Sequence, residues 1–290
     1  MDKCTLCPRE CSVDRDISVG VCGASGKVKI AKVMLHKWEE PSISGTNGSG
    51  AIFFSGCPLK CVYCQNKEIS HGLKGEEIST SELVSIMLSL QDTGAHNINL
   101  VTPTHFSSQI TEALELVRDK LKIPVVYNTS GYEKPEEIRK IGDYVSIFLT
   151  DIKYFSPELS QKYSRAKDYY KYAKASFFEM LRLQPKCVFD ENGIMKQGVI
   201  LRHLVLPSCR LDSIAILEDI ARDFDVSSFK LSLMSQYTPE FCDKVYKELL
   251  RRVTTFEYNS VVEKAISLGY DGYMQDKSSA SIAYTPDFNS

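Results

Sequence analysis

The sequence predicts an α/β fold built as a partial, TIM-like (β/α)6 barrel with a cysteine-rich extension at its N-terminus. Three observations predict it. From about residue 50 onward, short apolar runs alternate with amphipathic helical stretches, which is typical of parallel strands joined by right-handed crossovers. Six such units are present, whereas a complete barrel has about eight. Seven of the ten cysteines lie before residue 65.

The six expected strands are short and fully apolar rather than alternating, as expected for parallel strands covered on both faces. They are Ala51–Ser55, Ile98–Val101, Val125–Tyr127, Val145–Leu149, Val199–Leu206 and Phe229–Met234. A doubly wound sheet is the alternative architecture, because hydrophobic periodicity does not separate it from an open barrel.

Amphipathic helices are expected between these strands. Ser79 and Glu82 have the spacing of a capping box. Thr238 followed by Pro239 predicts another helix start, with proline in the first helical position, and Gly269 ends the last helix. The apolar stripes have the i, i+3, i+4, i+7 spacing of a helix face. They are Leu83, Ile86, Met87 and Leu90; Ile110, Ala113, Leu114 and Val117; Ile214, Leu217, Ile220, Ala221 and Phe224; and Tyr258, Val261, Val262, Ala265 and Ile266.

The N-terminal part differs from the rest, so we divide the chain into residues 1–48, the extension, and residues 49–290, the barrel. A strand is expected in the extension at Val28–Leu35. The glycine-rich segment Gly45–Gly50 is interpreted as a flexible turn. A phosphate-binding loop would follow a strand and continue into Gly-Lys-Ser/Thr, and this segment does neither.

Composition indicates an ordinary globular protein, with 43% hydrophobic and 25% charged residues. The 35 basic and 37 acidic residues give a formal net charge of −2, so charge gives no reason to expect a nucleic-acid or membrane partner. Lys167, Lys171 and Lys174 are interpreted as a solvated helix face rather than a nucleic-acid patch. The N-terminus resembles no signal peptide and no apolar run has the length of a membrane span, so we expect a cytoplasmic protein.

Clustered cysteines in a reducing cytosol bind metal or perform redox chemistry more often than they form disulfides. Cys57, Cys61 and Cys64 form a C-x3-C-x2-C triplet directly after the first expected barrel strand. Thiolates are soft ligands for iron–sulfur clusters and for zinc, which ordinarily take about four protein ligands. Three cysteines without a fourth beside them suggest a cubane with one open iron, at the strand end where barrels place active sites.

The triplet resembles the signature of the radical S-adenosylmethionine (SAM) enzymes, which have a partial (β/α)6 barrel. A longer set of segments, spread over essentially the whole chain, is similar to proteins that resemble pyruvate formate-lyase-activating enzyme. These segments are residues 39–66, Leu100–His105, Tyr127–Gly131, Arg202–Pro207 and Met234–Tyr237.

The resemblance implies that Cys57, Cys61 and Cys64 hold a 4Fe–4S cluster whose open iron binds the amino and carboxylate groups of SAM. An electron from the cluster would cleave the sulfonium, releasing methionine and a 5′-deoxyadenosyl radical that abstracts hydrogen from a substrate. The barrel would position the reactants and exclude side reactions. Tyr63 is expected to contact the adenine. The alternative for the triplet is zinc or a purely structural site.

Polar residues follow the second and third expected strands, where a barrel site draws its groups. Where many relatives have Gly-Gly-Glu-Pro at the methionine end of SAM, this sequence has Thr-Pro-Thr-His. Hydroxyl or backbone contacts to the cofactor are expected there from Thr102 and Thr104. The resemblance implies further cofactor contacts from Asn128, Thr129 and Ser130, which match a position that contacts the cofactor in activating enzymes. His105 is a candidate acid or base toward the substrate, with a structurally hydrogen-bonded histidine as the equal alternative.

The later strands supply a second group of candidates. Asp151 and Lys153 resemble an Asp-Leu-Lys motif and are candidate catalytic residues, with a structural ion pair as the alternative. Arg202 is expected to bind the carboxylate or the ribose of SAM, because guanidinium binds carboxylates bidentately. Gln236 is expected to contact adenine or substrate.

The extension holds four more cysteines, Cys4, Cys7, Cys11 and Cys22. A C-x2-C pair with two further cysteines predicts a second metal site, zinc or another iron–sulfur cluster, and the spacing leaves the metal open. Unmetallated thiols are the alternative. The remaining cysteines are expected to be ordinary free thiols: Cys187, Cys209 and Cys242.

The expected function is that of a radical SAM oxidoreductase, with activation of a glycyl radical enzyme by hydrogen abstraction from a backbone glycine as the leading hypothesis. The first alternative keeps the chemistry and changes the substrate to a peptide, nucleotide or small metabolite. The second is a non-catalytic iron–sulfur or zinc protein. The expected partner is an electron donor of the flavodoxin or ferredoxin type, and neither nucleic acid nor membrane is expected.

Overall fold

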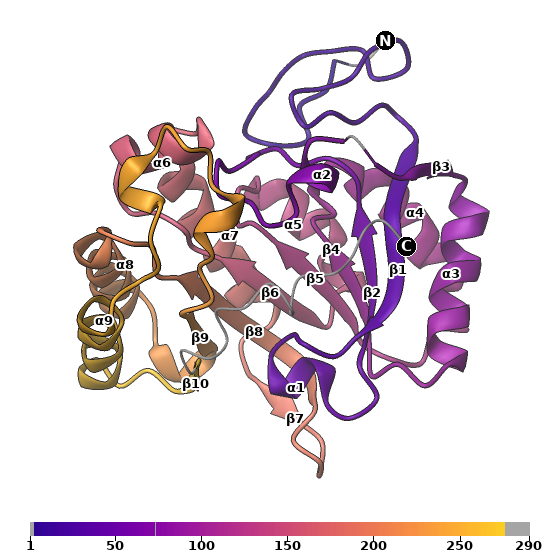
Figure 1. Ribbon diagram of the computed structural model, residues 1–290. Coiled ribbons are helices and arrows are strands. Elements are labelled where there is room, and N and C mark those ends of the chain that lie inside the picture. Colours follow the sequence, from indigo (N-terminus) through magenta and orange to yellow (C-terminus); the bar gives the residue numbers. More distant parts are fainter. Residues whose placement is uncertain (1–2, 73, 276–290) are drawn as a thin grey trace.

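The computed structural model describes residues 3–72 and 74–275 and contains the expected row of parallel strands (Figure 1). The parallel strands are β2 (Ser49–Phe54), β4 (Ile98–Val101), β5 (Val125–Thr129), β6 (Ile147–Asp151), β8 (Met195–Leu204), β9 (Lys230–Met234) and β10 (Gly272–Met274). All six expected strands are confirmed. Strand β10 is additional, and its three residues are too few to produce a sequence pattern.

The order of the strands decides between the two architectures that the sequence left open. The sheet runs β10-β9-β8-β6-β5-β4-β2-β1-β3, so each parallel strand lies beside the next parallel strand of the chain. A doubly wound sheet would reverse this order at a switch point, whereas an unreversed order is that of a barrel. The described strands at the two ends of the path, β10 and β3, do not pair, so the barrel is open.

Helices cover the outer face of the barrel (Figure 1). They are α3 (Thr80–Asp92), α4 (Ser107–Val117), α5 (Pro135–Ile141), α6 (Pro157–Ser164), α7 (Tyr169–Leu183), α8 (Arg210–Asp223) and α9 (Thr255–Ser267). The short helix α2 (Lys67–Ser70) lies instead at the upper end of the barrel, directly after the cysteine loop. The expected capping box is confirmed at α3, where Ser79 Oγ accepts from the Glu82 N–H at 3.2 Å and Glu82 Oε2 accepts from the Ser79 N–H at 2.7 Å. No helix among the described residues is both long enough and apolar enough to cross a lipid bilayer.

The prediction that a helix starts at Thr238 and Pro239 is wrong. Pro239–Phe241 is a single 3₁₀ turn, and the Thr238 side chain makes no cap hydrogen bond. The chain leaves the helical path after this turn because the Asp243 N–H donates to the Val62 carbonyl at 3.2 Å, which holds this segment against the cysteine loop. A tertiary contact therefore overrides a local helix signal.

The lysine stripe is only partly a solvated helix face. Lys171 is exposed on α7, as expected, and Lys167 precedes the helix. Lys174 is instead half-buried and forms ion pairs with Asp219 and Asp223 of α8. It joins two helices of the outer layer.

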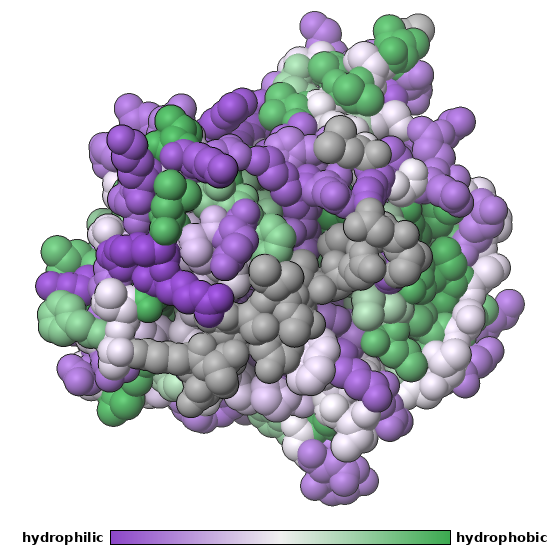
Figure 2. Space-filling model, in the orientation of Figure 1, coloured by the Kyte–Doolittle hydropathy of each residue, from purple (hydrophilic) through white to green (hydrophobic). Residues whose placement is uncertain are grey.

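The extension continues the sheet and then covers one end of the barrel. The expected strand is confirmed as β1 (Val28–His36), which pairs antiparallel with β2 and with β3 (Glu76–Ile78). Residues 3–27 contain no helix or strand and lie at the top of the view in Figure 1. Figure 2 shows apolar residues exposed there, and Ile17, Val19 and Val21 are the exposed ones.

A short helix closes the lower end of the barrel. Helix α1 (Pro41–Ser44) lies between β1 and β2, and its Ile43 side chain is fully buried. Ile43 packs in one cluster with residues that alternate along the strands and therefore face the barrel interior: Val126, Ile147, Leu149, Met195 and Ile200. This apolar layer forms the floor on which the polar layer above it rests.

Candidate active site

A cavity of about 300 Å³ lies above this floor, at the carboxyl ends of the parallel strands. A volume of this order is within the range of small-molecule sites. Six parallel strands contribute at least one residue each to its wall. In the order β2, β4, β5, β6, β8 and β9 these residues are Phe54, Val101, Asn128, Asp151, Arg202 and Ser232. Two of them, Asn128 and Arg202, lie two residues beyond Val126 and Ile200 of the floor, so the interior changes from apolar to polar along each strand.

The cysteine triplet lies in the loop after β2, and Cys57, Cys61 and Cys64 all line the cavity. The loop is held by backbone hydrogen bonds, with the Cys57 N–H donating to the Cys22 carbonyl at 3.0 Å and the Cys64 N–H to the Cys61 carbonyl at 3.0 Å. The sulfurs accept as well. Ser164 Oγ donates to Cys61 Sγ at 3.0 Å and the Leu59 N–H to Cys57 Sγ at 3.4 Å.

The donor set of the triplet fits an iron–sulfur cluster. Three thiols face one cavity, and the charge of each acts on its neighbours: burial raises the pKa of Cys57 to about 12, and Cys61 and Cys64 add to the rise. A thiol pKa this high means that the free Cys57 thiol is protonated at neutral pH, so metal binding by Cys57 must displace its proton. Among the described residues no group of three or more His, Cys, Asp or Glu side chains is positioned so that it could already hold a metal ion.

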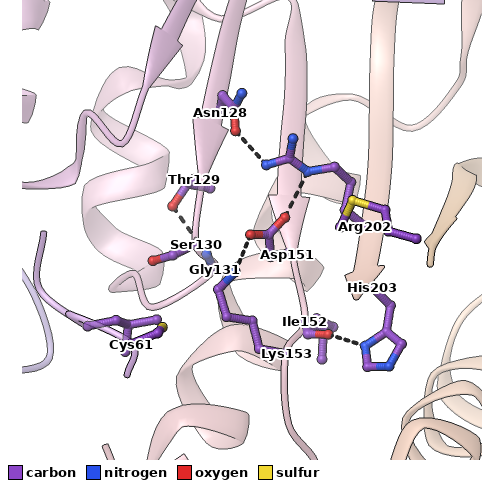
Figure 3. Close-up of polar contacts among 12 residues, drawn as sticks. Cys61, Asn128, Thr129, Ser130, Gly131, Asp151, Ile152, Lys153, Arg202 and His203 are labelled. Atoms are coloured by element: carbon purple, nitrogen blue, oxygen red, sulfur yellow. Dashed lines mark hydrogen bonds and ion pairs between the residues drawn. The ribbon is translucent and has the colours of Figure 1, made fainter. Parts of the chain in front are cut away.

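Arg202 is the centre of the polar layer (Figure 3). Its guanidinium donates to Asp151 Oδ1 at 2.8 Å, to Asn128 Oδ1 at 2.6 Å and to Glu39 Oε2 at 3.1 Å. Burial alone would lower its pKa, but Asp151, Glu40 and Glu39 raise it above its ordinary range. Its hydrogen bonds run to protein acceptors, so a contact to SAM would be made in addition to them.

Asp151 and Lys153 form an ion pair at the rim, with Lys153 Nζ 2.5 Å from Asp151 Oδ2 (Figure 3). Burial would raise the pKa of Asp151, but Arg202 and Lys153 together bring it below its usual value. For Lys153, burial acts to lower the pKa, and Asp151 and Cys61 raise it. Both groups are therefore charged, and the ammonium lies within electrostatic reach of the cysteine loop.

Glu39 and Glu40 were not predicted as site residues, but the structure brings both into the cavity wall. Burial raises the pKa of Glu40 to about 7, with Arg202 opposing the rise and Glu39 adding to it. Glu40 Oε2 is buried and has no hydrogen-bond partner among the described residues. The only sequence signal was the Glu-Glu-Pro just before Ser42. Nothing local showed that this turn enters the barrel.

Most of the other expected cofactor residues also line the cavity: Tyr63, Thr102, Thr129, Ser130 and Gln236. Thr102 has a φ of 56°, a left-handed conformation that is uncommon for threonine. The buried hydroxyl of Ser130 has no partner among the described residues. Tyr63 is hydrogen-bonded through its hydroxyl to the Tyr154 hydroxyl at 2.7 Å.

Thr104 and His105 are not part of the cavity wall. Thr104 Oγ1 donates to the buried Glu133 Oε1 at 2.5 Å. His105 Nε2 is 2.8 Å from the Ser55 carbonyl, and burial lowers its pKa to about 4. The geometry thus favours the structural alternative for His105 over an acid or base toward the substrate, because the ring is buried behind the strand end.

Comparison with known proteins agrees with this arrangement. A family model described as the radical SAM superfamily matches residues 51–186, which contain the triplet, most of β2 and the strands β3 to β6. The uncharacterized protein MJ0674 of Methanocaldococcus jannaschii is 30% identical over 276 residues, covering 91% of this chain and 73% of that protein. This chain belongs to the radical SAM superfamily. Members of that superfamily use a 4Fe–4S cluster and SAM, so the cofactors expected from the triplet are those of its family.

Solved structures agree on the fold of this radical SAM protein. SuiB of Streptococcus suis, in a crystal structure with its precursor peptide SuiA, superposes with a TM-score of 0.50 at 11% identity, over 76% of this chain and 46% of SuiB. SuiB without the peptide gives a TM-score of 0.50 at 12% identity. The chain therefore spans about half the length of SuiB. Within these matched regions the two chains share the fold of this partial barrel.

Proposed function

We propose that this radical SAM protein cleaves SAM reductively at a cluster held by Cys57, Cys61 and Cys64 and uses the product for hydrogen abstraction. The observation that carries the proposal is that these three cysteines line the same cavity as the Arg202 layer. When bound, the cluster supplies the electron that breaks the sulfonium into methionine and a 5′-deoxyadenosyl radical.

The chain's own residues have distinct tasks in this proposal. The Arg202–Asp151–Lys153 network keeps three charged groups fixed beside the cysteine loop, so no reorganisation of charge is needed when a ligand arrives. Thr102, Ser130 and Gln236 offer groups for the polar ends of SAM. The apolar floor that Ile43 forms with the strand residues around it keeps water out of the lower barrel, which protects a reactive intermediate.

The carboxyl groups of the cavity support a ligand with a hydrogen-bond-donating group. Three carboxyl groups, Glu39, Glu40 and Asp151, face two cations, Lys153 and Arg202. The Glu40 Oε2 atom that has no partner is therefore available to a donor on SAM or on the substrate. A buried polar group without a partner is costly, so a bound donor would be stabilising.

The proposed substrate is a backbone glycine of a partner enzyme, as the resemblance to activating enzymes implies. The electron would come from a donor of the flavodoxin or ferredoxin type. A second candidate is a peptide, supported by the shared fold of SuiB, whose crystal structure holds its precursor peptide. Electron paramagnetic resonance of reduced, reconstituted protein with candidate glycyl radical enzymes separates the two. A protein radical supports the first, and its absence with every partner contradicts it.

The cleavage chemistry is tested without a substrate. Anaerobic protein reconstituted with iron and sulfide, reduced with dithionite and given SAM, is expected to form 5′-deoxyadenosine, measured by liquid chromatography. Cys61→Ala is expected to abolish the product, and Cys187→Ala, a lone thiol outside the cavity wall, is the matched control. Failure of the unsubstituted protein to form the product would favour the non-catalytic iron–sulfur or zinc alternative.

A further inference from the structure

The segment before β1 has little apolar core of its own. In residues 3–27, Cys7, Cys22 and Ala24 are the buried hydrophobic residues, while Ile17 is 82% exposed. Short segments that cannot bury an apolar core usually depend on a disulfide or a metal for their structure. The cysteines are thus the chemical groups around which this segment is built.

All four cysteines of the segment lie close to one another. The Cys4 N–H donates to the Val13 carbonyl at 2.9 Å and the Ser12 N–H to the Cys4 carbonyl at 3.1 Å, which folds the chain back on itself. Gly20 is packed between two of the thiols, since a Cβ there would lie 3.3 Å from Cys11 Sγ and 3.3 Å from Cys22 Sγ. Burial raises the pKa of Cys7 to about 12, and the neighbouring Cys22 and Cys4 raise it further.

The segment also contacts the cysteine loop of the active site. The Cys22 carbonyl accepts the Cys57 N–H at 3.0 Å. Gly56, with a φ of 96°, has no room for a side chain because a Cβ would lie 2.8 Å from the same carbonyl. Arg9 donates to the Pro58 carbonyl and to the Ser164 carbonyl, each at 2.8 Å. One cysteine of the extension is thereby in direct contact with a proposed cluster ligand.

We propose that Cys4, Cys7, Cys11 and Cys22 bind one thiophilic metal centre, zinc or iron–sulfur, and that this centre holds Cys57 in position through Cys22. Four thiolates make a closed ligand set, which suits a centre without an open position, in contrast to the triplet. As their side chains lie in the structure, the four thiols do not form a group that could hold a metal ion. Binding requires their side chains to rotate between staggered rotamers and to lose their protons.

Metal content tests the site independently of SAM cleavage. Full-length protein is prepared anaerobically with iron, sulfide and zinc supplied, and metals per chain are measured by mass spectrometry. We expect the Cys4→Ser/Cys11→Ser double variant to lose one zinc, or about four irons if the centre is a cubane, while Cys187→Ser loses nothing. Loss of zinc or of iron identifies the centre. Unchanged zinc and iron in the double variant would overturn the site.

Two further variants separate a local effect from misfolding. Gly20→Ala places a methyl group between Cys11 and Cys22 and is expected to lower the same metal content without removing a ligand. The triple variant Cys57→Ala/Cys61→Ala/Cys64→Ala is expected to keep the extension's metal, and its loss there would show that the two sites are not separate.

The coupling to Cys57 has its own readout. The electron paramagnetic resonance signal of the reduced triplet cluster is expected to weaken severalfold or change shape in the Cys4→Ser/Cys11→Ser variant. An unchanged signal would overturn the positioning role of Cys22.

Discussion

Arg202 connects three strands or turns that are far apart in the sequence, through Glu39, Asn128 and Asp151. We expect Arg202→Met to lower the free energy of unfolding by about 3–5 kcal/mol, because it leaves buried carboxylates without their cation. Urea denaturation measures this. Arg118→Met, which removes an exposed ion pair with Glu115, is the control and should change stability by less than about 1 kcal/mol. A similar small change for Arg202→Met would contradict the importance of the network.

His203 makes folding sensitive to acid. Its ring is buried between the Ile152 carbonyl, at 2.6 Å from Nδ1, and Ser213 Oγ, at 2.8 Å from Nε2, and burial lowers its pKa to about 4. The unfolded chain binds a proton near the ordinary histidine pKa of about 6.5, so this contribution to stability is lost as the pH falls from about 6.5 toward 4.

We expect His203→Gln to reduce the loss of stability between pH 7.5 and pH 5 by about 2 kcal/mol, measured by urea unfolding at both values. His71→Gln, at a half-buried turn position, should keep the pH dependence of the unsubstituted protein. Identical pH dependence in His203→Gln would show that His203 does not cause the acid sensitivity.

At the scale of elements, helix α1 closes the barrel with a single side chain. We expect Ile43→Ala to cost about 2–5 kcal/mol, the loss typical of a buried large-to-small change in a packed core. Ile266→Ala on α9, where the side chain is 64% exposed, is the control and should change stability by about 0.5 kcal/mol or less. Thermal and urea unfolding measure both, and equal losses would mean that the barrel floor is not tightly packed.

The sequence predicted the elements whose signals are local. Six strands were found because both of their faces are buried, and α3 because Ser79 and Glu82 cap it. The floor at α1 was not predicted, because four residues carry no periodicity and their role depends on the chain entering the barrel. The helix predicted at Thr238 and Pro239 fails for the opposite reason. These two residues are typical of a helix start, but the contact between Asp243 and Val62 directs the chain elsewhere.

The candidate site was predictable where it follows a strand. Asn128, Asp151 and Arg202 share the cavity because parallel strands end at one edge, a rule that needs only the order of the elements. Glu40 was missed because it precedes the first barrel strand and reaches the cavity through the fold of the extension. His105 follows a strand as well, yet its ring points to the Ser55 carbonyl, and spacing does not give the direction of a side chain.

For the whole molecule, Arg9 fastens the extension to the barrel, with its guanidinium over the Tyr132 ring at 5.2 Å and bonded to the Pro58 carbonyl. We expect Arg9→Met to make residues 3–27 a severalfold better target for limited proteolysis, because local opening determines cleavage of a native chain. Mass spectrometry of the fragments locates the cut. Lys171→Met, on an exposed face of α7, should leave the cleavage pattern unchanged. Equal patterns in both variants would show that other contacts hold the extension.

Because Ile43 fills the lower end of the barrel in the part of the chain that the structure describes, reactants do not reach the cavity through that end. Two ligands that enter a narrow site from the same end bind and leave in a fixed order. We expect the ligand that binds deepest to bind first and to dissociate last. Steady-state kinetics should therefore show an ordered sequential mechanism in which the larger reactant binds second.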